Sequence, residues 1–170
     1  ANPTGKANNM GHPVVHALSH PDKAAVIMAG SGETITYKQL DERSNQCAHL
    51  FRSLGLQHGD TVAFCLENRA EFFDLVWGAQ RAGLIYVAIS CRLTASEIDY
   101  ILNDSGSKAL FASPYLGATL DQLQSPVKRF ILGGEHAGWE SYAAAIADMP
   151  TSPIADERAG TDMLYSSGTT

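Results

Sequence analysis

Short apolar runs alternate along this chain with longer stretches in which apolar residues recur every three or four positions. The runs predict buried strands, and the periodic stretches predict helices that bury one face. Strands are expected at residues 24–28, 34–35, 61–66, 84–89, 108–112, 129–132 and 162–165. Helices are expected at residues 12–21, after Thr36, Asn68, Thr94 and Pro114, and at residues 139–147. Strand and helix in alternation, with short links, predict an α/β fold with a largely parallel sheet flanked by helices.

Three of the expected helices begin with a capping-box pattern, in which the first side chain accepts from a helical N–H and the partner reaches back. The pairs are Thr36 with Gln39, Asn68 with Glu71 and Thr94 with Glu97. Gly55 and Gly83 follow the first two helices and predict where they end. The acidic pairs Asp41-Glu42 and Asp156-Glu157 are interpreted as capping or solvated groups.

Composition narrows the class of protein. One hundred and seventy residues, 45% of them apolar and 18% charged, are enough for one globular domain with a buried core. The formal charge of −6 argues against nucleic acid or an anionic membrane surface as the main partner. The longest apolar run, residues 84–89, is far too short to span a bilayer. An anionic ligand would therefore have to be held by local geometry.

The three cysteines, Cys47, Cys65 and Cys91, are irregularly spaced, and no secretory signal precedes them. Such a set is typical of a protein whose thiols stay reduced. We therefore expect unpaired thiols and a cytoplasmic protein.

Histidine recurs at every fourth position near the N-terminus, at His12, His16 and His20. Two histidines at this spacing on one helix face can bind zinc. Pro21 ends the expected helix directly after the third histidine. We interpret the series as a solvated or packed helix face and expect no metal site.

The chain closes on DMLYSSGTT, in which a short strand leads into a loop of serine, glycine and threonine. Backbone N–H groups in such a turn can converge on phosphate oxygens, and the hydroxyl groups add further donors. A frayed polar terminus is the alternative explanation of these residues alone. The Walker sequence G-x-x-x-x-G-K-[ST] is absent, which argues against an ordinary P-loop NTPase. No G-x-S-x-G elbow or nucleophile–base pair is visible.

Three segments, taken in order, carry a family resemblance. Residues 35–40, ITYKQL, are similar to a Thr-Tyr-x-Glu-Leu motif, with Gln39 in place of glutamate. Residues 81–87, RAGLIYV, look like an Ala-Gly-x-x-x-x-Pro segment, although Ala88 and Ser90 stand where proline and asparagine are common. Residues 165–170, YSSGTT, match the start of an ATP-phosphate loop. From about residue 13 to residue 170 the chain thus resembles the adenylate-forming superfamily, which includes acyl-CoA synthetases, firefly luciferase and peptide-synthetase adenylation domains.

Residues 59–68 and 91–106 are similar to the acyl-CoA synthetase branch of that superfamily. The resemblance implies part of the large N-terminal domain of an AMP-forming carboxylate–CoA ligase for a fatty or aromatic acid, with ATP, Mg²⁺ and CoA as its cofactors and co-substrates. The implied ATP-phosphate residues are Ser166, Ser167, Gly168, Thr169 and Thr170. Catalytic residues are expected beyond Thr170. The expected partners are a carboxylic acid, the remainder of the chain and, as an option left open, a second copy.

The resemblance also predicts how the chain is organised. Residues 1–11 are expected to be disordered or foreign to the natural protein, and residues 12–148 to form an α/β subdomain. Residues 149–161 are expected to connect this subdomain to residues 162–170, which hold the last strand and a truncated phosphate loop. The isolated chain is expected to be inactive, because the lysine of the loop and the mobile C-terminal domain lie further on. Two alternatives stay open: a peptide-synthetase adenylation domain and a non-catalytic module that acts through its surface.

Overall fold

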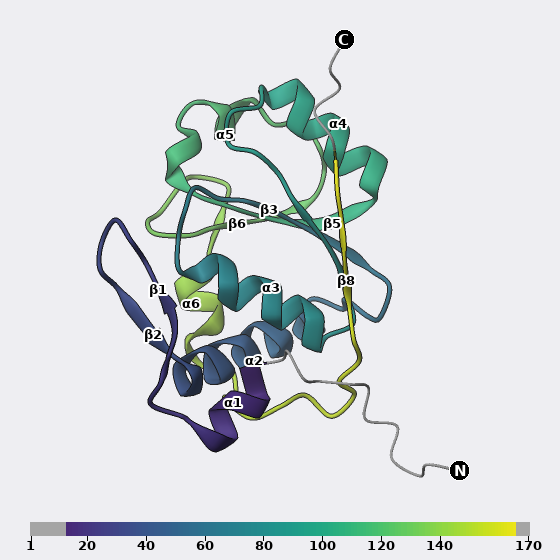
Figure 1. Ribbon diagram of the computed structural model, residues 1–170. Coiled ribbons are helices and arrows are strands. Elements are labelled where there is room, and N and C mark those ends of the chain that lie inside the picture. Colours follow the sequence, from purple (N-terminus) through teal and green to yellow (C-terminus); the bar gives the residue numbers. More distant parts are fainter. Residues whose placement is uncertain (1–12, 166–170) are drawn as a thin grey trace.

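The computed structural model describes residues 13–165, which form a six-stranded sheet with helices against both faces (Figure 1). The strand order is β7-β6-β5-β3-β4-β8, and every neighbouring pair is parallel. The strands are β3 (Thr61–Cys65), β4 (Ile85–Ala88), β5 (Ser107–Ala112), β6 (Lys128–Ile131), β7 (Glu140–Ser141) and β8 (Thr161–Met163). The α/β fold and the largely parallel sheet predicted from the sequence are confirmed.

The helices supply the crossovers that parallel neighbours need. They are α1 (Pro13–Ser19), α2 (Tyr37–Ser53), α3 (Glu71–Arg81), α4 (Ala95–Ser105), α5 (Thr119–Gln122) and α6 (Tyr142–Ala147), with a 3₁₀ turn η1 (Pro114–Leu116). Helices α2, α3 and α6 pack against one face of the sheet, and α4 and α5 pack against the other (Figure 1). The sheet is therefore the middle layer of three.

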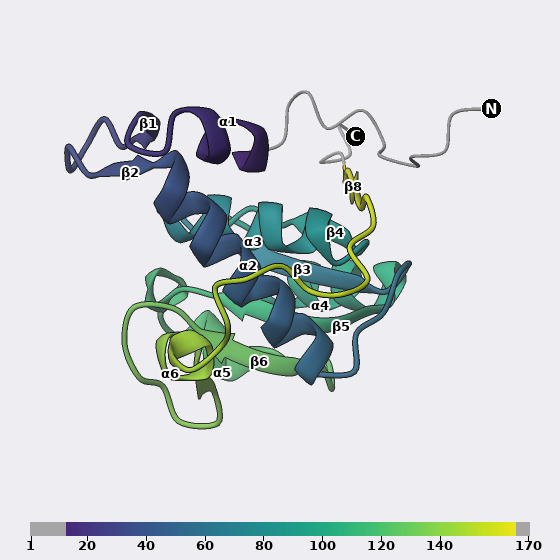
Figure 2. The same ribbon diagram turned by 90° about the horizontal axis from the view of Figure 1, so that it is seen from below.

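A small hairpin stands apart from this sheet. Its strands β1 (Ala24–Ile27) and β2 (Thr34–Thr36) are antiparallel, as the glycine-rich turn between them predicts. The hairpin and α1 lie beside the start of α2 (Figure 2). Met28 and Ile35 of this unit pack with Leu40 and Ala70 in a separate small core. The first 24 described residues, 13–36, thus extend the helical layer, and their strands do not join the six-stranded sheet.

The central strand β3 explains why the core has two halves. All five of its side chains are buried, and successive side chains of a strand point to opposite faces. Val62 and Phe64 pack among residues of α2 and α3, whereas Ala63 and Cys65 pack among residues of α4 and α5. A strand buried on both faces reads as a continuous apolar run in the sequence.

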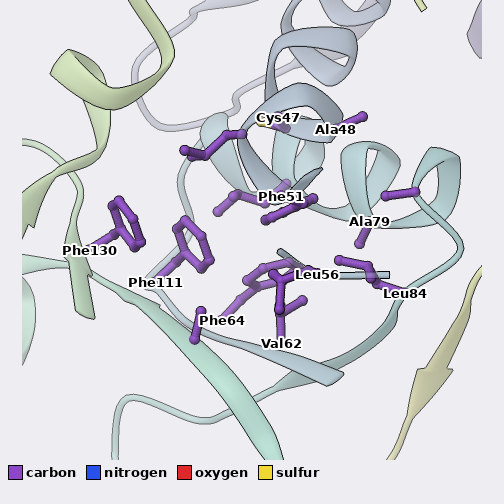
Figure 3. Packing of buried hydrophobic residues seen from close by; sticks show 14 of the residues in the cluster. Cys47, Ala48, Phe51, Leu56, Val62, Phe64, Ala79, Leu84, Phe111 and Phe130 are labelled. Carbon is purple, nitrogen blue, oxygen red and sulfur yellow. The ribbon is translucent and has the colours of Figure 1, made fainter. Parts of the chain in front are cut away.

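Aromatic rings fill the half of the core that lies under α2 (Figure 3). Phe111 and Phe130 come from adjacent strands and stack with ring centroids 4.9 Å apart. Phe51 of α2 meets Phe111 edge-on at 5.6 Å, and Tyr142 of α6 does so at 6.0 Å. Stacked and edge-on pairs of this kind contribute roughly 0.5–1.5 kcal/mol each beyond their buried area. The rings fix α2 and α6 on the sheet.

Two of the three predicted capping boxes are confirmed. Gln39 N–H donates to Thr36 Oγ1 at 3.2 Å, and Thr36 N–H donates to Gln39 Oε1 at 3.0 Å. The same reciprocal pair forms between Thr94 and Glu97, with both distances at 3.3 Å. The substitution of glutamine for glutamate at position 39 therefore leaves the cap intact.

The third capping box, at Asn68, is wrong. Helix α3 begins at Glu71, and its N-cap is Ala70, which makes no side-chain cap hydrogen bond. The reason is a competing partner, because the Glu71 carboxylate accepts two hydrogen bonds from Arg69, at 3.0 and 3.3 Å. The Glu71 carboxylate is thus directed to Arg69, and no reciprocal bond forms between Asn68 and Glu71.

The predicted helix at residues 139–147 is also partly wrong. Residues Glu140–Ser141 form strand β7, and only Tyr142–Ala147 are helical. Phe130 and Ile131 of β6 pair in parallel with residues 140 and 141, so that sheet hydrogen bonds take the first positions of the expected helix. Ser141 then caps the shorter helix by accepting from Ala144 N–H at 3.3 Å.

Candidate functional site

The candidate site is the edge of the sheet at which β3, β4 and β8 end. Because these strands are parallel, their carboxyl ends lie at the same edge, and open α/β sheets bind ligands in the crevice outside that edge. Strand β8 pairs with β4 from Thr161 to Met163, and the chain leaves it through Tyr165. The predicted phosphate-binding residues Ser166, Ser167, Gly168, Thr169 and Thr170 lie outside the described residues. Their assignment stays a prediction.

A cleft of about 460 Å³ opens at this edge. Its walls are the segment after β3, the first turn of α3 and the end of β4; the lining residues are Leu66, Glu67, Asn68, Arg69, Phe72, Phe73, Ala88, Ile89 and Ser90. The lining of the cleft is chemically mixed, because two phenylalanine rings lie beside charged and amide side chains. A concave site with a few convergent polar groups is the usual form of a small-molecule site.

Arg69 is the central charge of the cleft. Its guanidinium donates to Glu71, to Glu67 Oε1 at 3.2 Å and to the Leu132 carbonyl at 3.4 Å. Burial raises the pKa of Glu71, but the hydrogen bond from Arg69, a hydrogen bond from its own backbone N–H and the positive charges of Arg69 and Arg43 together outweigh burial and lower the pKa of that carboxyl. Arg69 is thus occupied by the protein's own acceptors. The second oxygen of Glu67 is buried and has no partner among the described residues, which leaves one acceptor to spare.

The approach to β8 is held by α2. The polar segment that precedes β8 crosses this helix (Figure 2), and a side chain from each turn binds its backbone or side chain. Asn45 Nδ2 donates to the Thr151 carbonyl at 2.8 Å, and His49 Nε2 donates to the Ser152 carbonyl at 2.8 Å. Arg52 Nε donates to Asp156 at 3.1 Å. We call residues 149–160 the strap.

Arg81, at the end of α3, anchors the strap to helices α2 and α3. Its buried guanidinium pairs with Asp41 of α2 and with Glu157 of the strap, the latter at 2.8 Å, and it donates to Asn45 Oδ1 at 2.6 Å. The Arg81 carbonyl accepts from Arg158 N–H at 3.0 Å. The acidic pairs that the sequence presented as caps or solvated groups therefore contribute one residue each to a buried charge network. Removing one member of such a network is costly, because the other charge stays behind.

Gly160 sets the strap against the sheet. Its amide donates to the Gln80 carbonyl at 3.0 Å, and a Cβ at this position would lie 2.3 Å from the Leu84 carbonyl oxygen. Thr161 N–H then donates to that same oxygen at 3.1 Å, which begins the pairing of β8 with β4. Glycine is needed here because of the close approach of two backbones.

Tyr165 fixes the far end of β8. Its hydroxyl donates to Asp104 Oδ2 of α4 at 2.8 Å, and its ring packs against the core that α4 covers. The residue that precedes the predicted phosphate loop is therefore bound to the helix layer opposite α2. The residues that lead to the predicted loop are therefore held from both faces of the sheet.

The histidine series and the cysteines occupy separate places. The His16 ring packs 4.8 Å from the Tyr37 ring, and His20 Nδ1 shares a hydrogen bond with Ser19 Oγ. His12 lies outside the described residues, so the absence of a metal site stays a prediction; within residues 13–165, no group of three or more ligand side chains is arranged to hold a metal. All three cysteines are free thiols.

Sequence reasoning missed the cleft and the charge network. The signal for Arg81 was present, since the residue opens the segment Arg81-Ala82-Gly83, but its partners lie 40 and 76 positions away. The signal for Arg69 was its place between two glutamates at positions 67 and 71. Neither pattern predicts a contact without the fold.

The fold and this edge define an α/β domain of the class that binds ligands outside the carboxyl ends of its parallel strands. The sequence profile described as "AMP-binding enzyme" matches residues 15–170. The chain belongs to the AMP-binding enzyme family, which confirms the resemblance to the adenylate-forming superfamily.

Its relatives include ligases of fatty acids. The chain is 32% identical over 157 residues to a fatty acid–[acyl-carrier-protein] ligase, ScoC of Streptomyces coeruleorubidus, and covers 30% of that protein. It is 34% identical over 165 residues to the long-chain-fatty-acid–CoA ligase FadD13 of Mycobacterium tuberculosis, and covers 31% of it. In both comparisons 91% of this chain is matched. The chain therefore spans about 30% of the length of these curated relatives.

A solved structure confirms the architecture. The inhibitor-bound N-terminal domain of FACL13 from Mycobacterium tuberculosis matches with a TM-score of 0.78 and 28% identity, over 92% of this chain and 40% of that one. In the described part of this chain, no helix has both the length and the apolar character needed to cross a membrane.

Proposed function

We propose that the chain is part of an ATP-dependent, AMP-forming fatty acid–CoA ligase. In this reaction the substrate carboxylate attacks the α-phosphorus of ATP, pyrophosphate leaves, and the acyl group passes from the acyl adenylate to the CoA thiol. The observation that supports the proposal is the pairing of β8 with β4, because the Ser-Ser-Gly-Thr-Thr sequence follows this strand in a member of the AMP-binding enzyme family.

The proposed role of Ser166, Ser167, Gly168, Thr169 and Thr170 is to hold the β- and γ-phosphates. Backbone N–H groups and hydroxyls suit this role because they donate hydrogen bonds to anionic oxygens, each worth roughly 1.5–3 kcal/mol. The donor set suits phosphate and not a protein-held metal cage, so Mg²⁺ would be bound chiefly by the nucleotide and would supply charge neutralisation. Tyr165 and the strap would orient the loop without touching the reacting atoms.

The class of acid rests on the relatives. ScoC and FadD13 are both named as fatty acid ligases, and they differ in the thiol that receives the acyl group. We favour CoA because residues 59–68 and 91–106 resemble the acyl-CoA synthetase branch. A cytoplasmic location is part of the proposal, since three free thiols suit a reducing compartment.

The test is carboxylate-dependent exchange of pyrophosphate into ATP, run on the longer parent protein and on residues 1–170. The parent is expected to be active with fatty acids, and acyl transfer is then compared between CoA and an acyl-carrier protein. Aromatic acids and amino acids complete the panel. Activity with an amino acid alone would make the protein a peptide-synthetase adenylation domain, and a parent inert with every acid would favour the non-catalytic module.

The isolated 170 residues are expected to be inactive. A loop that stops at Thr170 lacks its later N–H donors and a lysine, and the loss of three charge-assisted contacts weakens ATP binding by at least about a thousandfold. Exchange activity in residues 1–170 alone would contradict this part of the proposal.

A further inference from the structure

Two of the three cysteines meet at the edge where β3 and β4 end. Phe64 pairs with Ala88 across the two strands, and Ile89 N–H donates to the Phe64 carbonyl at 2.8 Å. This register places Cys65, the last residue of β3, beside the residues that follow Ile89. The two cysteines lie 26 positions apart in the sequence, but the parallel pairing brings them together.

A tight turn holds Cys91 in place. Leu93 N–H donates to the Ser90 carbonyl at 3.3 Å, and Arg92 N–H donates to Ser90 Oγ at 3.2 Å. The Cys65 thiol approaches the same Ser90 carbonyl at 3.8 Å. The Cys91 side chain packs against the core cluster that contains Cys65. The turn that carries Cys91 is thus fixed to the end of β3, next to the Cys65 thiol.

The two thiols differ in access and in acidity. Cys65 is fully buried, whereas Cys91 is partly exposed. The hydrogen bond with Cys65 lowers the pKa of Cys91, against the opposing effects of partial burial and of the Glu67 carboxylate. The same hydrogen bond raises the pKa of Cys65, and burial adds to it. A reactive thiolate needs a lowered pKa and access to the reagent, and only Cys91 has both.

We propose that Cys65 and Cys91 form an oxidisable dithiol that closes to an intramolecular disulfide when the protein meets a hydroperoxide. The Cys91 thiolate attacks a peroxide oxygen, so that an S–O bond forms, the O–O bond breaks, and the leaving oxygen takes up a proton. The Cys65 sulfur then attacks Cys91 Sγ, the S–O bond breaks, and the hydroxide released takes the Cys65 proton to give water. With hydrogen peroxide, two thiols and one peroxide give one disulfide and two waters.

Cys47 provides an internal contrast. It is fully buried between α2 and α6, and its Sγ lies 2.7 Å from the Tyr142 hydroxyl. Burial, with a smaller effect from Asp74, raises the pKa of this thiol far above its usual value. It packs in the core on the other face of the sheet from Cys65. Cys47 should therefore stay reduced while the other two thiols react.

Oxidation would also change the rim of the cleft. Ser90 lines the cleft, and its carbonyl accepts from the Cys65 thiol in the reduced protein. A disulfide consumes that donor and ties the turn at residues 90–93 covalently to β3. The inference concerns these thiols alone and does not depend on the proposed ligase activity.

The experiment is peptide mapping after oxidation. The full chain is treated with hydrogen peroxide under native conditions, unreacted thiols are blocked with N-ethylmaleimide in denaturant, and the protein is digested with trypsin. Each cysteine lies in its own tryptic peptide, residues 44–52, 53–69 and 82–92 respectively. The expected product joins peptides 53–69 and 82–92, is lighter than their sum by two hydrogen atoms, and separates on reduction. Peptide 44–52 should carry N-ethylmaleimide throughout.

Variants and an unfolded sample make the result decisive. The matched control Cys47→Ser should form the link as the wild type does, whereas Cys65→Ser and Cys91→Ser should not form it. In Cys65→Ser, the sulfenic acid of Cys91 should be trapped by dimedone. The idea fails if native protein with Cys91 already oxidised shows no link between the two peptides. It fails equally if protein oxidised in urea gives the Cys65–Cys91 link in the same yield and gives no link to Cys47. The fold would then contribute nothing to the choice of disulfide partner.

Discussion

Arg81 and Glu157 form an ion pair with their charged atoms 2.8 Å apart, although 76 positions separate them in the sequence. Arg81 belongs to the helix layer and Glu157 to the strap, so the pair ties the approach of β8 to the rest of the fold. The Arg81 side chain is 1% exposed and the Glu157 side chain 40% exposed. The guanidinium therefore depends on its partners far more than the carboxylate does.

Replacement of Arg81 by methionine is expected to lower the free energy of unfolding by about 2–4 kcal/mol. The change removes the ion pairs to Asp41 and Glu157 and leaves the buried amide oxygen of Asn45 without its donor. Urea denaturation at neutral pH measures the loss. The control is Arg52→Met, which breaks a pair with the exposed Asp156 and a hydrogen bond to the Leu56 carbonyl, and which should destabilise the chain less than Arg81→Met does. Equal losses in the two variants would show that the buried network adds nothing.

Gly160→Ala is expected to destabilise the chain by about 1–3 kcal/mol, because the added Cβ would lie 2.3 Å from a carbonyl oxygen that cannot move freely. The clash lies at the start of β8, so amide signals of β8 should shift more than those of β3 in a heteronuclear NMR spectrum. Gly30→Ala is the control, since nothing lies within 4 Å of a Cβ there. A Gly160 variant as stable as wild type would refute the close approach.

The buried carboxyl of Asp74 predicts a pH-dependent stability. Asp74 Oδ1 has no hydrogen-bond partner among residues 13–165, and burial raises the pKa of this group to about 7. In the unfolded chain the pKa is about 4. At a pH between these two pKa values, the folded state keeps a proton on Asp74 that the unfolded state has lost. The free energy of unfolding therefore falls as the pH rises from about 4 to about 7.

Asp74→Asn removes this titration. The variant is expected to exceed the wild type in free energy of unfolding by about 2–4 kcal/mol at pH 8, and the difference should vanish near pH 4. Urea denaturation over that pH range measures it, with the exposed Asp22→Asn as control. A difference that does not change with pH would contradict the assignment.

The caps can be tested against each other. Thr94→Ala should cost about 1 kcal/mol, because it removes the hydroxyl that accepts from Glu97 N–H. Asn68→Ala should cost less than about 0.5 kcal/mol, because α3 has no side-chain cap and Asn68 is not its N-cap. Thermal unfolding followed by circular dichroism compares the two. A larger loss at Asn68 would restore the capping role that its spacing suggested.

The sequence predicted those parts of the fold that depend on neighbouring residues. The strand at Thr61–Cys65 was visible because it is buried on both faces, and the caps at Thr36 and Thr94 were visible because both partners lie within three positions. The prediction of a cap at Asn68 was wrong because the neighbouring Arg69 binds the Glu71 carboxylate. The spacing of Asn68 and Glu71 in the sequence does not take this second partner into account.

The candidate site was less predictable, for a physical reason. The sequence pattern favours capping or solvated roles for Asp41 and Glu157, because acidic pairs on helix starts and linkers usually have them. Their shared partner Arg81 is distant in the sequence, so the pattern does not indicate the ion pairs. The contact of Cys65 with Cys91 likewise requires the register of β3 and β4, which the amino-acid pattern does not specify. The phosphate-loop residues, by contrast, were predicted from a resemblance and lie outside the described residues.

The strap has a consequence for the order in which the chain folds. Its bonds to Asn45, His49 and Arg52 join positions 103–106 apart, and contacts of such separation form late because a long loop must first be closed. Strand β8 pairs along only three residues, at the border of the sheet. It should therefore be added after α2 and α3 have assembled, and its amides should exchange with deuterium faster than those of β3. The segment that leads to the predicted phosphate loop should then be the last of the described elements to fold and the first to open.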